Sequence, residues 1–377
     1  MSHFSLSEID PSWLAMLKSR LRDYHYQEEA IASRLDIPSI YIIRHLDIPL
    51  HTHRLRKICP ENILIRLFLL EEELEAKAIK HVFTPSEVEI LEKIKLIRIK
   101  ERGRRVKSQV KIYPYQGYYF ASDRQFFPEE EVKDAELVYY IGSDSIDLAS
   151  STVRREVTST LDLCTGTGIQ AILAAKHTRK VIGVDINPRA VNFAGFNAKL
   201  NQVENVSFVV GDLYEPVGED KFDLILANPP FVPSPHEESD EVFYRDGGKK
   251  GHDILSQIMR GLSAHLKEGG YCQIITLFAR TSDRSQEELL KSWLNNGPYQ
   301  TSLFLLDTYS IYQIAYSNTF TIALEKNYNT YKKEVVRWLE SFVSQGIEAI
   351  DYGVINVLPG EAFTFTRWSS QSVIGDR

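Results

Sequence analysis

The 377-residue sequence lacks several features that would assign it to a special class of protein. It has only three cysteines, Cys59, Cys164 and Cys272, and this small odd number favours reduced thiols over a disulfide framework. No stretch of about 18 apolar residues occurs, so no membrane-spanning helix is expected. The first residues have no basic segment before an apolar core, so no signal peptide is expected. These absences predict a cytoplasmic protein.

The chain also lacks an excess of positive charge. Its 44 Lys and Arg against 51 Asp and Glu give a net charge of -7, which argues against a protein that coats nucleic acid. His45, His51, His53 and Cys59 show no recognised ligand spacing, so no metal is expected. The length exceeds the roughly 250–300 residues at which single cores stop growing, and two domains are therefore expected.

A glycine turn stands near the middle of the chain. The segment Ser159–Cys164 is apolar and typical of a strand, and Gly166 and Gly168 separate it from IQAILAAKH, which has helical spacing. Strand, glycine turn and helix form the first half of a βαβ unit, where the backbone can approach a ligand closely. No Walker A lysine follows, and Ala171 replaces the third glycine of a dinucleotide fingerprint. The turn indicates a nucleotide-like cofactor.

Two acidic residues follow further apolar runs. Asp185 ends KVIGVD, about 20 residues after the glycine turn, where a carboxylate can accept hydrogen bonds from ribose hydroxyls. Asp212 ends VSFVVGD, where a carboxylate can meet an adenine amino group. Each residue alone could be a strand-end turn residue or a helix N-cap. Their occurrence at successive strand ends favours the cofactor site.

The string LANPPF at 226–231 places an amide, two prolines and an aromatic ring after a buried strand. An amide or aniline-like nitrogen is a poor nucleophile, because its lone pair is delocalised. The side-chain carbonyl of Asn228 and the backbone carbonyl of Pro229 can accept its N–H hydrogens, while Phe231 stacks on the flat group. Such orientation can lower a barrier by about 7 kcal/mol. The alternative is a simple Asn-Pro-Pro turn.

DLCTGTG, GVDINPRAVNFAGFNA, VVGDLYEP and ILANPPF together resemble the successive motifs of class I S-adenosylmethionine-dependent methyltransferases, in the small-domain subgroup that carries NPPF or NPPY. The resemblance covers about residues 141–325. It implies an α/β, Rossmann-like seven-stranded sheet and S-adenosylmethionine as cofactor. Cys164 departs from the glycine or small residue of many relatives, and we expect it to pack as a small hydrophobe.

The resemblance also implies roles for single residues. The catalytic residues it implies are Asn228, Pro229, Pro230 and Phe231. The cofactor-binding residues it implies are Asp162, Cys164, Thr165, Gly166, Gly168, Asp185, Ile186, Asp212, Leu213 and Asn228.

The region before residue 130 has a different pattern. Asp10-Pro11 predicts a helix start, 61–80 predicts one helix, and Thr84–Glu87 is a capping box that opens another. The aromatic-rich 106–122, with a glycine at its centre, predicts a β-hairpin. Helices before a hairpin suggest a mainly helical, winged-helix-like domain for substrate recognition. Its basic stretch 93–111 has two interpretations. It is either a positively charged wing that contacts RNA, DNA or an acidic protein surface, or a solvated helix end and turn.

The remaining chain predicts a cofactor-binding domain at 131–328 and a C-terminal helix and strand extension at 329–377. Last strands are expected at 300–307 and 319–324, with a possible edge strand at 353–358. The segment that includes Arg245–Gly248 is long for a loop, so it either closes over substrate or is a solvated turn.

Three functions fit these observations. The favoured one is methylation of a planar nitrogen in a protein, an Asn or Gln side-chain amide. The alternative is methylation of an exocyclic amine of RNA or DNA, guanine or adenine, with the basic stretch as docking element. In a third, the cofactor fold is only a scaffold for partner binding, which the intact Asn228, Asp185 and Asp212 disfavour.

Overall fold

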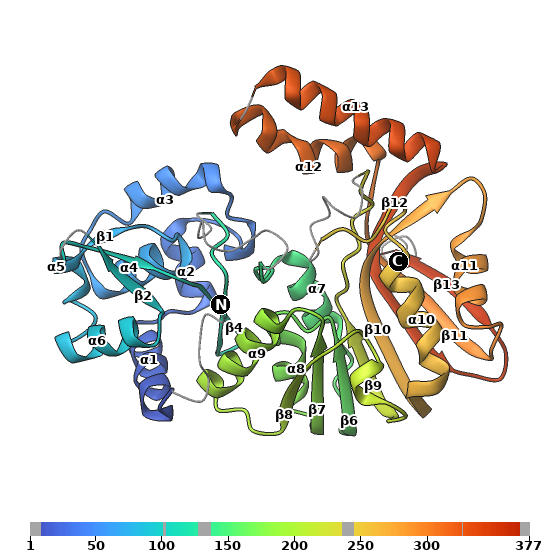
Figure 1. Cartoon of the computed structure of the whole chain (residues 1–377), viewed down its shortest axis with the longest axis horizontal. Helices are drawn as coiled ribbons and strands as arrows, with labels where there is room; N and C mark the ends of the chain where they lie inside the picture. Colours follow the sequence, from blue (N-terminus) through green and yellow to red (C-terminus); the bar gives the residue numbers. More distant parts are fainter. Residues whose placement is uncertain (1–8, 101–102, 127–136, 236–244, 326, 370–377) are drawn as a thin grey trace, which may run out of the picture. The chain divides into compact units, whose positions relative to one another are not determined.

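The computed structural model of the chain describes residues 9–100, 103–126, 137–235, 245–325 and 327–369 (Figure 1). They form two compact units. The first contains the described residues within Met1–Ile146, Thr165–Lys176 and Asp185–Val210, and the second those within Asp147–Cys164, His177–Val184 and Gly211–Arg377. Among the described residues, no helix is both long and apolar enough to cross a membrane.

The N-terminal part of the first unit is mainly helical, as predicted. Asp10 caps its first helix by accepting a hydrogen bond from the Ser12 backbone N–H at 2.8 Å. Thr84 and Glu87 form the predicted capping box. The helices are α1 (Pro11–Asp23), α2 (Glu28–Leu35), α3 (Ile48–Arg54), α4 (Pro60–Leu64), α5 (Ala76–Ile79) and α6 (Pro85–Lys93).

Two small sheets accompany these helices. The strands β1 (Leu74–Glu75), β2 (Ile97–Lys100) and β3 (Arg105–Ser108) form a sheet in the order β1-β3-β2. The strands β4 (Lys111–Tyr115) and β5 (Tyr118–Ser122) form a hairpin whose two turn residues both have positive φ, so the predicted turn around the glycine is confirmed. Residues 106–108 of the predicted hairpin belong instead to β3, which pairs with β2. The winged-helix-like arrangement of this region stays a prediction.

The single helix predicted over 61–80 is wrong. After α4 the chain continues as a π-helical turn, Ile65–Leu69, and the helix then ends before Glu71, which has φ of 60°. The buried Glu71 carboxylate accepts hydrogen bonds from the backbone N–H groups of Gln125 and Phe126 and lies 3.7 Å from the Lys111 ammonium. A buried carboxylate needs such partners, and they outweigh the helical propensity of the segment.

Side-chain amides join the hairpin to the helix α9 (Pro188–Asn201) within the first unit. Asn197 donates to and accepts from the backbone of Ala121, at 2.9 and 2.7 Å. Asn201, one turn later, makes the same pair of bonds with Tyr119, at 2.7 and 2.9 Å. The two amides therefore satisfy the backbone of β5 much as a neighbouring strand would.

The large sheet has eight strands in the order β13-β11-β12-β10-β9-β6-β7-β8. Strand β9 runs parallel to β6 and β10, and β12 is antiparallel to both of its neighbours. The predicted α/β methyltransferase-like sheet is confirmed, with β13 as an additional edge strand. The strands are β6 (Val157–Leu163), β7 (Thr178–Asp185), β8 (Val206–Val210), β9 (Phe222–Ala227), β10 (Leu266–Thr281), β11 (Tyr299–Tyr309), β12 (Ile347–Pro359) and β13 (Thr364–Ser369).

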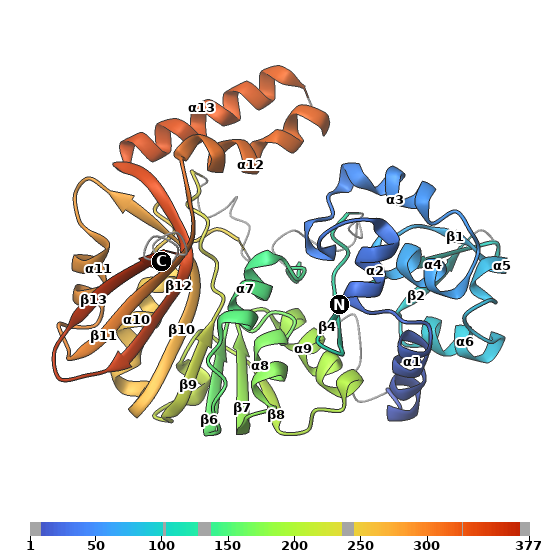
Figure 2. The same cartoon turned by 180° about the vertical axis from the view of Figure 1, so that it is seen from behind.

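Alternation along β10 separates two cores in the second unit. Its residues Cys272, Ile274 and Phe278 pack with α10 (Asp253–His265) and α11 (Gln286–Trp293). Its residues Ile275, Leu277 and Ala279, which point to the other face, pack with α12 (Ile311–Glu325) and α13 (Tyr328–Ser344). The two views show α12 and α13 side by side (Figures 1 and 2).

The C-terminal part differs from the prediction in two places. The segment 319–324 is not a strand, because it continues α12, where Thr319 is fully buried and bonds back to the Ala315 carbonyl. The segment 353–358 is not at an edge, since it belongs to β12, between β10 and β11. A helical hairpin therefore separates β11 from β12 in the sequence.

Candidate active site

The register of three parallel strands places their carboxyl ends together. Leu163 of β6 pairs with Val184 of β7 and with Ala227 of β9. The residues that follow directly are Cys164, Asp185 and Asn228, so these three predicted residues leave the sheet at one edge. Ligands of open parallel sheets bind outside this edge.

The glycine turn follows β6 as predicted and leads into α8 (Ile169–Ala174). The Gly168 backbone N–H donates to the Thr165 carbonyl at 2.7 Å, and Gly168 has φ of 78°. A Cβ at Gly168 would lie 2.9 Å from the Ala194 Cβ. Glycine is therefore required here both by backbone conformation and by the close approach of α9.

Asp185 is tied to the same turn. Its carboxylate accepts hydrogen bonds from the Gly166 backbone N–H at 2.8 Å and from the Asn187 backbone N–H at 2.9 Å. Desolvation raises the pKa of Asp185, while these two donors oppose the rise. Ile186, the next residue, is 57% exposed. An oriented carboxylate beside an exposed apolar side chain suits a ribose with an attached flat base.

Two predicted cofactor residues have strained backbones. Cys164 has φ of 56° and Leu213 has φ of 45°, in the left-handed region that costs a non-glycine residue about 1–2 kcal/mol. Such strain gathers at functional sites. The left-handed backbone at Cys164 also explains why glycine suits this position. The expected packing of Cys164 as a small hydrophobe did not give this reason. Asp212, next to Leu213, is exposed, whereas Asp162 lies buried within β6.

The predicted catalytic tetrapeptide follows the buried end of β9. Pro229 is buried, while Asn228, Pro230 and Phe231 are partly exposed. Phe231 packs at the border of the core that contains Val232. The tetrapeptide is thus fixed on one side and accessible on the other.

A glycine-rich segment holds the end of this tetrapeptide. The Val232 backbone N–H donates to the Arg245 carbonyl, and the Gly247 N–H donates back to the Val232 carbonyl, both at 2.9 Å. A Cβ at Gly247 would lie 2.8 Å from the Pro230 carbonyl oxygen, and one at Gly251 would overlap the Phe231 carbonyl oxygen. Residues 245–251 therefore support the tetrapeptide. The predicted closure of this loop over substrate concerns residues 236–244 as well, and these lie outside the described part of the chain.

His252, directly after the glycine-rich segment, is a buried residue whose packing on β10 the sequence analysis missed. Its ring Nε2 accepts a hydrogen bond from the Ala279 backbone N–H at 3.1 Å, and its ring meets Phe278 and Trp293 edge-on. Burial lowers the pKa of His252 to about 4, so the ring is neutral and can accept that bond. The glycine run before His252 is visible in the sequence, but the approach of Gly247 and Gly251 to the tetrapeptide appears only in the fold.

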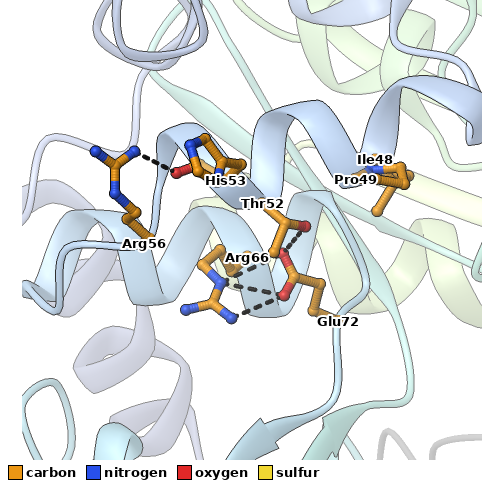
Figure 3. A pocket seen from close by; sticks show the side chains of 7 residues that line it. All are labelled: Ile48, Pro49, Thr52, His53, Arg56, Arg66 and Glu72. Atoms are coloured by element: carbon orange, nitrogen blue, oxygen red, sulfur yellow. Dashed lines mark hydrogen bonds and ion pairs between the residues drawn. The ribbon is translucent and has the colours of Figure 1, made fainter.

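A separate pocket of about 620 Å³ lies in the N-terminal part of the first unit (Figure 3). In its lining Arg66 donates to Glu72 at 2.9 Å, and Thr52 donates to the same carboxylate at 2.6 Å. None of the predicted site residues lines it. The full lining is Ile48, Pro49, Thr52, His53, Arg56, Arg66 and Glu72. Among the described residues, no three His, Cys, Asp or Glu side chains are grouped as metal ligands.

The sequence model of the methyltransferase small domain family matches residues 142–296. Together with the sheet and the strand-end residues, this match defines a class I S-adenosylmethionine-dependent methyltransferase. The chain belongs to the methyltransferase small domain family, and its cofactor is S-adenosylmethionine.

Curated relatives agree with this assignment. A Methanocaldococcus jannaschii protein assigned as a protein N5-glutamine methyltransferase is 43% identical over 142 residues, which are 37% of this chain and 71% of that protein. The ribosomal protein uL3 glutamine methyltransferase of Bradyrhizobium diazoefficiens is 34% identical, over 38% of this chain and 49% of that enzyme. The release factor glutamine methyltransferase of Aliivibrio fischeri is 35% identical, over 33% and 48%. The chain spans about half the length of the last two.

Proposed function

We propose that this enzyme transfers a methyl group from S-adenosylmethionine to the side-chain amide nitrogen of a glutamine in a protein. The observation that carries the proposal is the position of Asn228 at the end of β9, in register with the ends of β6 and β7. The glutamine methyltransferases among its relatives support a glutamine acceptor over an asparagine.

Residues of the tetrapeptide orient the acceptor. When bound, S-adenosylmethionine supplies a sulfonium-activated methyl group. The Asn228 side-chain carbonyl and the Pro229 backbone carbonyl accept the two amide hydrogens, which directs the nitrogen lone pair. Pro229 and Pro230 restrict the backbone, and Phe231 packs on the flat amide. The gain is one of proximity and orientation, since an amide nitrogen is not deprotonated first.

The strand-end residues fit the cofactor. The Asp185 carboxylate, already oriented by two backbone N–H groups, accepts the ribose hydroxyls, and the exposed Ile186 covers the adenine. The strained Cys164 and Leu213 keep the backbone of both strand ends in the conformation that the cofactor requires. Residues of the turn, with Asp162, Asp212 and Asn228, complete the proposed contacts.

The region 1–130 is proposed to recognise the acceptor protein, with 131–328 as the catalytic domain and 329–377 as its extension. Within the basic stretch 93–111, three cations are engaged by the protein itself. Arg105 lies 3.1 Å and Lys100 3.8 Å from the Glu73 carboxylate. Lys111 is buried, and its pKa is lowered to about 7 by that burial. These contacts favour a protein over an RNA or DNA acceptor.

The test is transfer of tritiated methyl from S-adenosylmethionine to a whole-cell extract, divided between nuclease and protease treatment. The proposal expects label that resists nuclease, is lost with protease, and appears as N5-methylglutamine after hydrolysis. Label that is removed by nuclease would instead identify an RNA or DNA amine methyltransferase.

A further inference from the structure

The helical hairpin of α12 and α13 interrupts the sheet at a functionally important edge. It joins β11 to β12, and β11 runs in the same direction as β10 and β9, because both β10 and β11 are antiparallel to β12. The hairpin therefore leaves the sheet from the edge at which β9 delivers Asn228. Figure 1 shows it beyond the ends of these strands.

The strands extend well past the level of the catalytic tetrapeptide. Ile274 of β10 pairs with Ala227, the last residue of β9, but β10 and β11 continue together to the level where Ile350 pairs with both Ala279 and Tyr309. Five residues of strand from Ile274 to Ala279 span about 17 Å. This extension is a wall above the candidate site.

A buried apolar core connects the segment after the tetrapeptide to the hairpin. Val232 packs in the same core as Ile314 and Ala315 of α12 and Trp338 of α13. Phe231 lies at the border of that core, and so do Tyr309 and Ile311, all partly exposed. The Arg245 guanidinium also lies 3.5 Å from the Asn318 side-chain oxygen. The hairpin is thus packed onto the segments that hold the tetrapeptide.

The exposed face of α12 carries a row of aromatic side chains, Tyr312, Tyr316 and Phe320, at intervals of four residues. Tyr312 is 68% and Tyr316 59% exposed, and the rings of Tyr316 and Phe320 stack at 5.7 Å. Residues 311–323 contain no charged side chain. An aromatic row without charge favours an uncharged or apolar polypeptide partner. Single-stranded nucleic acid also stacks on aromatic rings, but it needs cations along its backbone.

We propose that this aromatic row binds a segment of the acceptor protein next to its target glutamine. This inference rests on the proposed function above. An extended chain spans about 3.3–3.6 Å per residue. Because the end of β11 lies about 17 Å beyond the level of Asn228 along the strands, the row is at least about five extended residues from a glutamine held at Asn228. A small acceptor bound at Asn228 is too short to reach the row, whereas a polypeptide segment reaches both.

The test compares a Tyr312→Ser/Tyr316→Ser double variant with a matched control, Tyr328→Ser. Tyr328 is 70% exposed at the start of α13, outside the row. The probe is a nuclease-treated whole-cell protein extract with tritiated S-adenosylmethionine, and the initial rate of protein labelling is measured against extract concentration. We expect the half-saturating concentration to rise about tenfold in the double variant, with an unchanged maximal rate and unchanged S-adenosylhomocysteine affinity. Tyr316→Phe and Tyr328→Ser keep wild-type values.

Three results would overturn the inference. One is labelling by the double variant at the wild-type half-saturating concentration, and this outcome leaves the proposed function intact. The second is a tyrosine-dependent dimer in light scattering, which would identify a second copy of the chain as the occupant. The third is label that nuclease removes from untreated extract, which refutes a protein acceptor for the wild-type enzyme as well. Thermal melting shows whether the exposed substitutions leave the fold intact.

Discussion

A substitution at Gly251 should displace the proposed catalytic tetrapeptide while leaving its four residues unchanged. Gly251 has φ of 72°, and a Cβ added there would overlap the carbonyl oxygen of Phe231 and lie 3.1 Å from ring carbons of Pro233. Gly269 has the same φ of 72° but has nothing within 4 Å of such a Cβ. The pair Gly251→Ala and Gly269→Ala therefore shares the backbone strain and differs in the contacts with Phe231 and Pro233.

The shared strain of a left-handed alanine is about 1–2 kcal/mol, so both variants should melt a few degrees lower. Only in Gly251→Ala must the Phe231 carbonyl move away. Because a misplacement of about 1 Å can reduce a rate about 100-fold, we expect its transfer rate to fall 10- to 100-fold. Gly269→Ala should stay within twofold of the wild type. The assay is initial-rate transfer of tritiated methyl, with melting measured on the same samples. Equal activity in the two variants would refute the supporting role of residues 245–251.

Three further perturbations test other parts of the structure. Cys164→Gly should raise the free energy of unfolding by up to about 1 kcal/mol, since φ is 56° there, and a loss above 1 kcal/mol in urea denaturation would contradict this reading. Glu71→Gln should cost about 3–5 kcal/mol on the same measurement, because it leaves the buried Lys111 and Arg124 without their carboxylate; a cost below 1 kcal/mol would show that the ion pairs do not hold the helix end. The pKa of His252 is about 4 in the folded state, below its unfolded value of about 6.5, so the unfolded state binds more protons between these values. Stability should therefore fall by about 3 kcal/mol as the pH drops from 6.5 to 4, and His252→Asn should flatten that part of the stability-pH curve, although Lys250 and Asp283 also act on the ring.

The cofactor turn and the tetrapeptide could be found from the sequence because their signals are local. Glycine at position 168 is needed by its own φ and by one neighbouring helix, and the acid of β7 follows its strand directly. Caps such as Asp10 and Thr84 were found for the same reason, since each acts within three residues. Features that one segment carries by itself leave a pattern in that segment.

The features that were missed depend on distant residues. The helix over 61–80 breaks because Glu71 takes partners some 40 to 55 residues later in the chain, and no local pattern shows this. The segment 319–324 has strand-like β-branched residues, yet it continues α12, whose Ile314 and Ala315 pack in one core with residues of β10 and α13. The support of the tetrapeptide by Gly247 and Gly251 likewise appears only once the chain has folded back on Phe231.

The central claim is that Asn228 orients the acceptor amide while Asp185 holds the cofactor. The most direct test measures, for Asn228→Ala and Asp185→Ala, both the methyl-transfer rate to protein and the affinity for S-adenosylhomocysteine by calorimetry. We predict that Asn228→Ala loses at least 100-fold in rate, as expected when reacting groups lose their orientation, with an affinity within threefold of the wild type, whereas Asp185→Ala loses affinity at least tenfold. Transfer by Asn228→Ala at a rate close to that of the wild type would contradict the account.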